Sequence, residues 1–388
     1  MLFDRDHRKT FVCGENMPEL DAGERKLWRV LDVALVSSFL VVALRVLNDV
    51  RLGGHGFKQG DYLINSIVEP VRRGHLGTAA IWVSDLLGSN PLYVVAAFQF
   101  VMLVILYVSV RTVFRAIGRA ELALLLALSA AFFVTFWVAD PQGSVRKELI
   151  AFAGLALLAS GFLARSNLKI ALGAVVFCIA LVSHEAMVLL LPACAAIFVI
   201  GRDGPSGPRL VWALAGLIAL TAAYTAWYTL TFNEVSAPDR ICLPLLERGV
   251  GEHVCGGAIA WLQHDMDYGM RRVAEMLDGP GIAKFAAGYL VSLLPFGLIS
   301  INQDRPRVFL FGVLIAALPF VPLYVIAVDW GRWIGLHVFS VTVLFSMLLA
   351  TGRARSDFPI RRPRFYGLLA LGVVLSPSHV LGILTIIR

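Results

Sequence analysis

Long apolar stretches separated by short polar segments are the feature that most constrains this chain. A helix of about twenty apolar residues crosses the hydrocarbon layer of a membrane. Because lipid cannot satisfy an open strand edge, each long apolar stretch is predicted to be a helix. The candidate spans are 28–47, 91–110, 120–138, 148–164, 168–182, 186–201, 209–232, 282–300, 308–328, 333–350 and 365–387. The sequence therefore predicts an all-α, polytopic integral membrane protein with about 11 transmembrane helices.

The composition excludes a water-soluble enzyme. Hydrophobic residues make up 58% of the 388 positions and charged residues only 16%, whereas soluble proteins average roughly 45–50% apolar and 25% charged. The net charge of +7 is distributed between the apolar stretches, so membrane topology explains it. We expect no nucleic-acid partner.

The Lys and Arg residues predict the orientation of the chain. Residues 1–27 are polar and of mixed charge, which indicates a cytosolic N-terminal tail and not a cleaved signal peptide. The rest of the chain, 28–388, is predicted to be a single transmembrane domain. With the N-terminus inside, most of the 34 Lys and Arg residues lie in cytoplasmic segments, as the positive-inside rule requires. The long loops 48–90 and 233–281 then face outward.

Both outer loops contain predicted structural features of their own. Apolar residues recur at helical spacing in 61–73 and again in 76–87, which predicts two amphipathic helices lying in the membrane interface. The second loop contains prolines and glycines, so we expect it to be partly irregular. Cys242 and Cys255 share that loop, and on an oxidising face they are expected to form a disulfide. We expect no metal site, because no metal-ligand spacing such as Cys-x-x-Cys occurs.

The turn Ser183-His184-Glu185 separates two apolar stretches that are short for membrane spans. Either both helices cross a locally thinned bilayer, or their shared turn lies below the outer surface. In the second case His184 and Glu185 project into an outward recess, where ionisable side chains mark functional sites. The alternative is a structural pair that caps a helical hairpin.

Arg146 and Lys147 precede the fourth predicted span. Two cations at a helix N-terminus form an anion site, because the helix dipole and free N–H groups add to their charge. The planar guanidinium of Arg also suits phosphate. The alternative is ordinary snorkelling of both side chains to the membrane surface.

The segment Asp329 to Trp333 joins two apolar spans through a short outer turn. Trp330 and Trp333 are either interfacial belt residues or a surface that stacks on a sugar. Arg332 either pairs with Asp329 or binds a phosphate. In the first outer loop, Asp61 is either a helix N-cap or a general base for an acceptor hydroxyl.

Together these motifs resemble the EpsG-like family of exopolysaccharide-synthesis membrane proteins, within the GT-C class of membrane glycosyltransferases. Asp61 lies in the first outer loop before the two expected interface helices. Arg146 opens a middle span, and His184 follows about forty residues later at a helical hairpin. The turn from Asp329 to Trp333 corresponds to a late Asp…Arg-aromatic turn.

The resemblance implies a GT-C-like fold and a glycosyltransferase or polymerase in the bacterial inner membrane, with its active site facing the periplasm. The donor is then a polyprenyl-phosphate- or polyprenyl-pyrophosphate-linked sugar, and the acceptor is a glycan of a cell-surface polysaccharide. Membrane lipids and other polysaccharide-export components are the further partners that it implies. We expect neither a metal nor another cofactor.

The residue roles that agree with this resemblance follow from the charge of the leaving group. Cations aimed at the departing phosphate stabilise it, and those expected here are Arg146, Lys147 and Arg332. His184 can hydrogen-bond the phosphate or relay a proton. A carboxylate is expected to accept the proton of the acceptor hydroxyl. Asp61 is the preferred candidate for this base, and Glu185 and Asp329 are the alternatives.

The sequence is compatible with three other functions. A transporter of polysaccharide or lipid-linked oligosaccharide requires polar residues in both membrane halves. A membrane acyltransferase of envelope glycans would use His184 as its catalytic residue. A structural assembly subunit would need no site. One cavity that opens outward favours transfer, whereas a channel open at both ends favours transport.

Overall fold

The computed structural model describes residues 22–202, 207–233, 235, 237–277, 281–377 and 383–385. Most of the predicted N-terminal tail lies outside these residues. In the described part, helices form nearly all of the regular structure. The α-helices are α1 (Ala22–Arg51), α2 (Gln59–Tyr62), α3 (Gly74–Leu87), α4 (Pro91–Ala116), α5 (Ala120–Ala127), α6 (Phe133–Ala139), α7 (Glu148–Leu163), α8 (Asn167–Ser183), α9 (Leu191–Gly201), α10 (Pro208–Thr231), α11 (Pro238–Leu246), α12 (Met266–Leu277), α13 (Gly281–Ile301), α14 (Pro306–Ile315), α15 (Val321–Ile326), α16 (Trp330–Ala350) and α17 (Arg362–Val374). The 3-10 helices are η1 (Glu185–Leu190), η2 (Glu252–Val254), η3 (Ala260–Gln263) and η4 (Leu318–Phe320), and the strands are β1 (Leu375–Pro377) and β2 (Ile383–Thr385).

Six helical segments are long and apolar enough to cross a membrane. They are Ala22–Arg51, Pro91–Ala116, Pro208–Thr231, Ile282–Ile301, Pro306–Ile326 and Trp330–Ala350. Three shorter apolar helices accompany them, at Glu148–Leu163, Asn167–Ser183 and Glu185–Gly201. The prediction of an all-α membrane protein is confirmed at this level.

The predicted span 120–138 is not one helix. It divides into α5 and α6, with residues 128–132 irregular between them. Backbone that leaves a helix inside a bundle must find other hydrogen-bond partners, and here hydroxyl groups supply them. Thr135 Oγ1 donates to the Ser129 carbonyl at 2.6 Å, and Ser376 Oγ donates to the Ala130 carbonyl at 2.8 Å. Arg45, which interrupts the first span, donates to two carbonyls at the end of α6.

The predicted span 365–387 is also wrong as a continuous helix. Helix α17 ends at Val374, and β1 and β2 pair as a short antiparallel hairpin. Pro377 explains the change, because the ring of proline breaks a helix and the residue before it is driven to extended backbone. Residues 378–382 and 386–387 of this predicted span lie outside the described residues.

Of the two predicted interface helices, only the second forms. Residues 76–87 belong to α3, but 63–73 are irregular after the single turn of α2. Pro70 disfavours a helix there, and the segment pairs with other parts of the chain instead. Asn65 Nδ2 donates to the Ile241 carbonyl at 2.8 Å. A Cβ at Gly77 would lie 2.1 Å from the Ile64 carbonyl oxygen, so glycine allows α3 to lie directly against this segment.

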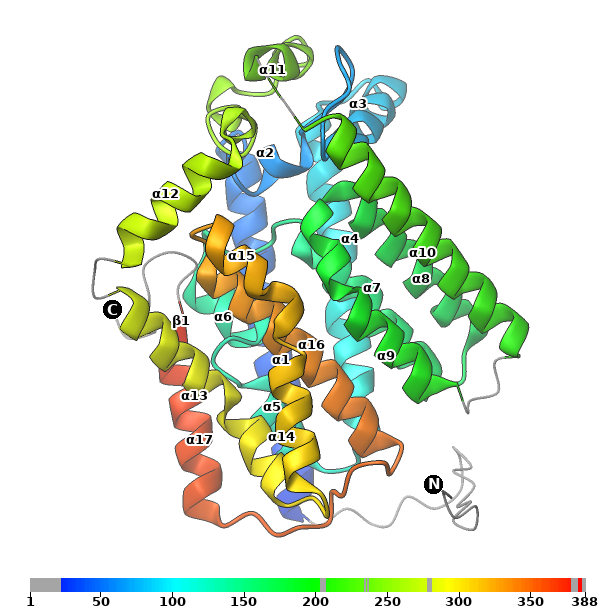
Figure 1. Ribbon diagram of the computed structural model, residues 1–388, viewed down its shortest axis with the longest axis vertical. Coiled ribbons are helices and arrows are strands. Elements are labelled where there is room, and N and C mark those ends of the chain that lie inside the picture. The colour runs from blue at the N-terminus through cyan, green and yellow to red at the C-terminus, as the bar shows by residue number, and fades with distance from the viewer. Residues whose placement is uncertain are drawn as a thin grey trace.

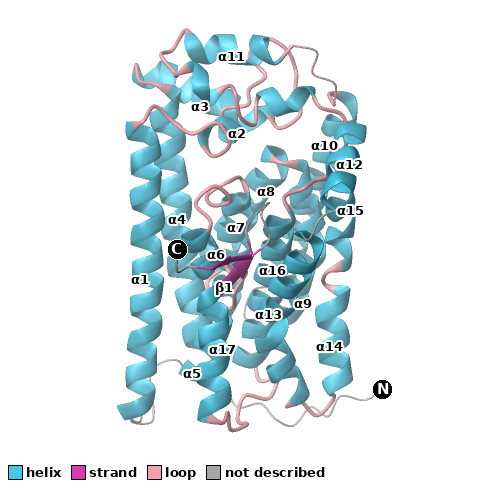
Figure 2. Cartoon of the chain, turned by 90° about the vertical axis from the view of Figure 1, so that its left-hand side faces the viewer, coloured by secondary structure: helices cyan, strands magenta, loops and turns pink. Residues whose placement is uncertain are grey.

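A layer of short elements covers one end of the bundle. Figure 1 shows α2, α3 and α11 across that end, and Figure 2 shows α1 and α4 running nearly the full height while α6, α7, α8 and α16 stop below it. We call α2, α3, α11, η2 and η3 the cap. The two long loops join there: Arg248 pairs with Asp85 through two hydrogen bonds of 2.6 and 2.8 Å. The Ala258 N–H donates to the Gly56 carbonyl at 3.0 Å.

Candidate functional site

Charged side chains from five separate segments meet beneath the cap. We call them the charged cluster: Asp61, Arg73, Arg146, Lys147, Glu148, His184, Glu185, Asp329 and Arg332. Each segment lies at the end or the start of a helix, so the ends of α2 and α8 and the starts of α3, α7 and α16 converge on one place. All the charged residues predicted from the sequence as site residues belong to this cluster.

One half of the cluster is built around Arg332. Its guanidinium donates to Glu148 at the first position of α7 and to Asp329 before α16. The same Asp329 oxygen, Oδ2, lies 3.5 Å from Arg146 Nη1. Two arginines therefore share one carboxylate oxygen. Of the expected alternatives for Arg332, the structure shows the pair with Asp329.

The other half of the cluster is built around Arg73. This arginine makes a two-armed ion pair with Glu185, in which Nε lies 2.8 Å from Oε2. Its carbonyl accepts a hydrogen bond of 3.2 Å from Lys147 Nζ, which also lies 3.6 Å from Asp61 Oδ1. The side chain of Lys147 is fully buried. Snorkelling to the membrane surface therefore does not describe Lys147.

His184 begins the 3-10 helix η1. Its Nδ1 accepts a hydrogen bond of 3.1 Å from the Ala186 N–H, so the neutral ring carries its proton on Nε2. The capping role predicted as the alternative is therefore present, but it uses only one ring nitrogen. Glu185 Oε2 lies 3.6 Å from the same Nδ1.

Asp61 is not an N-cap. Lys58 precedes α2 at that position, and Asp61 is inside the helix and 4% exposed. Burial acts to raise the pKa of Asp61, but the positive charges of Lys147, Arg73 and Arg332 hold that pKa below its usual value. Burial lowers the pKa of Lys147 to about 8, against the opposing charge of Asp61. The carboxylate is thus ionised and set against a lysine that titrates near neutral pH.

Several residues that position the cluster were missed in the sequence. Tyr62 is buried, and its hydroxyl donates to the Arg146 carbonyl at 2.9 Å. Gln99 donates to the Val145 carbonyl at 3.1 Å and accepts from Gln59 at 3.0 Å. Val145 has a φ of 56°, which is strained for a β-branched residue. The polar Gln99 inside an apolar span was the available signal for this support.

Three buried polar atoms around the cluster have no hydrogen-bond partner among the described residues. They are Asp61 Oδ1, Arg332 Nε and Trp333 Nε1. Leaving buried polar atoms unpaired costs about 1–3 kcal/mol each. Such atoms in a buried cluster fit a site that binds a polar ligand.

An apolar groove of about 400 Å³ lies beside the charged cluster, because Tyr62 lines the groove and its hydroxyl donates to the Arg146 carbonyl. It lies among α3, α4 and α8 and is lined mainly by aliphatic side chains and Phe98. Its polar lining residues are His75, Tyr62 and Ser183, and the last two are the chain neighbours of Asp61 and His184. The groove and the cluster together suit a molecule with an apolar chain and a charged head.

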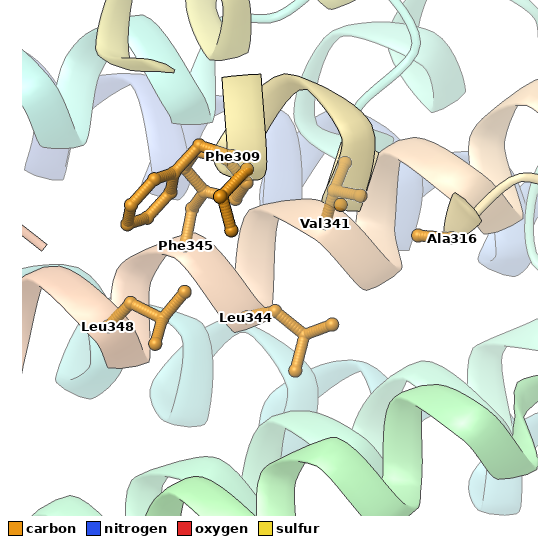
Figure 3. Close-up of a pocket in the computed structure, with 8 residues that line it drawn as sticks. Phe309, Ala316, Val341, Leu344, Phe345 and Leu348 are labelled. Carbon is orange, nitrogen blue, oxygen red and sulfur yellow. The ribbon is translucent and has the colours of Figure 1, made fainter. Parts of the chain in front are cut away.

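A second cavity, of about 260 Å³, lies between α14 and α16 and is shown in Figure 3. Its walls are wholly apolar and include Phe309, Leu344 and Phe345. No ionisable side chain lines it. We therefore do not assign chemistry to this cavity.

The two tryptophans predicted to stack on a sugar are buried in protein. Trp330 is 7% exposed, packs edge-on against Phe285 and donates to the Tyr324 carbonyl at 3.0 Å. Trp333 is 4% exposed and lies under the Arg332 guanidinium, 5.0 Å away. Neither indole ring therefore presents an exposed face on which a sugar could stack.

The structure joins Cys242 and Cys255, the pair expected from the sequence, by a disulfide with 5.9 Å between the Cα atoms. This bond links α11 to the segment between η2 and η3. It therefore fixes two parts of the cap to each other.

Known protein families, characterised proteins and solved structures give no match to this chain. Its site must be interpreted from its own residues.

Proposed function

We propose that this protein is a membrane glycosyltransferase or polymerase that uses a polyprenyl-phosphate- or pyrophosphate-linked sugar as donor. One observation carries the proposal: a largely buried cluster with four cations lies beside an apolar groove, and Tyr62 belongs to the wall of that groove while its hydroxyl donates to the Arg146 carbonyl. A lipid-linked sugar phosphate has the matching chemistry, because its chain is apolar and its head is an anion. The resemblance to EpsG-like, GT-C proteins supports the same activity.

Arg146 is the cation best placed to receive the phosphate. Its contact with Asp329 is the longer of the two that this carboxylate makes with arginines, and its Nε contact with the Gln142 carbonyl is 3.4 Å. Arg332, by contrast, is held by two carboxylates. A phosphate can thus displace Asp329 from Arg146 at small cost, while Arg332 keeps Glu148 and Asp329 in position.

The transfer step then follows from these positions. The acceptor hydroxyl attacks the anomeric carbon, a C–O bond forms, and the bond from that carbon to the phosphate oxygen breaks. The electron pair leaves with the phosphate, where Arg146 and Lys147 stabilise the growing negative charge. The proton of the hydroxyl goes to Asp61, which is ionised and buried in the cluster. His184 donates through Nε2 to the phosphate or relays a proton.

The same proposal includes the finer features of the fold. The broken segment α5–α6 and the C-terminal segment that begins with α17 are taken as membrane segments beside the nine apolar helices, which makes about 11 in a GT-C-like arrangement. The cap faces the periplasm of a bacterial inner membrane. Cell-surface polysaccharide is the product.

The experiment compares purified variants in lipid nanodiscs with a synthetic polyprenyl-phosphate sugar and a glycan acceptor. R146A should lose transfer by about a hundredfold, the scale for one preorganised transition-state donor. R307A is the matched control, because Arg307 is exposed in the first turn of α14, and α14 lies toward the end of the bundle opposite the cap (Figure 1). Normal transfer by R146A, or movement of the intact donor across the bilayer without a new glycosidic bond, would contradict the proposal.

A further inference from the structure

An array of aromatic rings extends from the charged cluster to the partly exposed Trp261 of η3 and on to α12. The Arg146 guanidinium lies over Phe57, with its carbon 5.1 Å from the ring centre. Phe57 lies 6.3 Å from Trp261 of η3. His264 and Tyr268 follow, at 5.3 and 5.9 Å from Trp261. We call Phe57, Trp261, His264 and Tyr268 the aromatic track.

The backbone holds this track in place. Gly56 and Gly257 lie so close that a Cβ on Gly257 would be 2.1 Å from the Gly56 carbonyl carbon. The Ala258 N–H bonds to the Gly56 carbonyl, so Phe57 is held beside the chain that leads to Trp261. The disulfide at Cys255 fixes the start of that chain to α11. The track is therefore a preformed surface, which lowers the entropic cost of binding.

Trp261 differs from the tryptophans that the sequence singled out. It is 43% exposed, whereas Trp330 and Trp333 are buried. Exposed polar residues surround it in the chain, among them Gln263 and Asp265. Trp212 of α10 is even more exposed, at 75%, but its chain neighbours Val211 and Ala213 are apolar, as expected for a lipid-facing position.

We propose that the aromatic track binds the acceptor glycan and leads its reactive end to Arg146 and Asp61. The C–H face of a pyranose ring is weakly positive and packs on the negative face of an aromatic ring. Its hydroxyls can donate to the carboxylate of Asp265 and to the amide oxygen of Gln263. A lipid chain would leave these polar groups without partners. The role of the bound glycan as acceptor rests on the proposed function. Binding of a glycan by the aromatic track does not depend on that function.

The test measures glycan binding to the purified protein in nanodiscs by saturation-transfer NMR. The probes are maltotetraose, cellotetraose and chitotetraose. At least one should bind the wild-type protein, and W261A should bind it at least tenfold more weakly. W261F should retain much of the binding because it keeps a ring. W212A, the exposed-tryptophan control, should bind as the wild type does.

Binding of no probe by the wild type, or equal binding by W261A, overturns the inference. R146A separates it from the proposed function, because this variant should lose transfer but still bind the oligosaccharide. Binding that depends on Trp261 in a protein without any transfer activity would uphold the track and reject the transferase. If W261A instead catalyses transfer with an unchanged KM for the acceptor, the transferase is upheld and the aromatic track is rejected as the acceptor site.

Discussion

At the scale of single residues, the cations of the cluster are not free charges waiting for a phosphate. Each arginine is paired with at least one carboxylate, and Arg332 with two. Alanine in place of a free cation would leave the fold intact. In this cluster it would not, because removing one partner of a buried ion pair leaves the other charge uncompensated.

We therefore expect R332A to be strongly destabilised as well as inactive. Glu148 would remain as a buried carboxylate without its arginine, and the loss should be about 3–5 kcal/mol. Thermal unfolding followed by fluorescence in detergent measures this. The double variant R332M with E148L should recover much of the loss, because it removes both charges of a pair. Equal unfolding temperatures of R332A and wild type would show that this pair does not support the fold.

A second residue-scale prediction concerns pH. Burial lowers the pKa of Lys147 to about 8, so the ammonium is charged below that pH and neutral above it. The loss of its charge removes a cation beside Asp61 and the proposed phosphate. Transfer should fall as pH rises through about 8. In K147R this alkaline limb should disappear, because guanidinium stays protonated. A pH profile of kcat/KM is the measurement, and an unchanged limb in K147R would assign it to another group.

At the scale of elements, periodicity and length predicted the long spans well. Helices α1, α4, α10 and α16 cover apolar stretches identified in the sequence. The errors arose where tertiary contacts override local pattern. In 63–73 the apolar residues have helical spacing, but Pro70 and the bonds of Asn65 to α11 hold the segment irregular. The helix predicted over 120–138 is likewise interrupted, because side-chain hydroxyl groups within the bundle bond to the backbone that leaves the helix.

Gly77 provides a test of that irregular segment. In G77A the new Cβ would meet the Ile64 carbonyl at 2.1 Å, so α3 and the segment from Asp61 to Arg73 must move apart. We expect a loss of about 1–3 kcal/mol from overpacking and a clear fall in transfer. Gly216 of α10 is the control, because a Cβ there meets nothing within 4 Å. G216A should be neutral or more stable by up to about 1 kcal/mol.

At the scale of the whole molecule, the residues of the cluster are distant in sequence but share one end of the bundle. The sequence predicted most of its charged members, since charges at helix ends in an apolar chain are conspicuous. It could not predict their pairing, because that depends on how the starts of α7 and α16 and the end of α8 come together beneath the cap (Figure 2). Nor did it predict Arg73 and Glu148 as members, because each reads as an ordinary interfacial charge.

The orientation of the molecule is the last prediction. Disulfides persist in oxidising compartments, so the bond between Cys242 and Cys255 leads us to expect the cap on the outer face of the membrane. The opposite end of α16 precedes the basic segment that begins at Arg353, which the positive-inside rule places in the cytoplasm. Both arguments give the same orientation from independent features.

Cysteine labelling of intact cells tests it, in a chain whose other three cysteines, at 13, 178 and 194, are replaced by serine. E247C lies at the exposed end of α11 in the cap, and T351C lies at the exposed end of α16 on the far side. A membrane-impermeant maleimide should label E247C directly and T351C only after permeabilisation. The reverse pattern would place the charged cluster toward the cytoplasm, where a periplasmic glycan cannot reach it, and the proposed acceptor would have to be abandoned. Labelling of both in intact cells would instead contradict the assignment of α16 as a span.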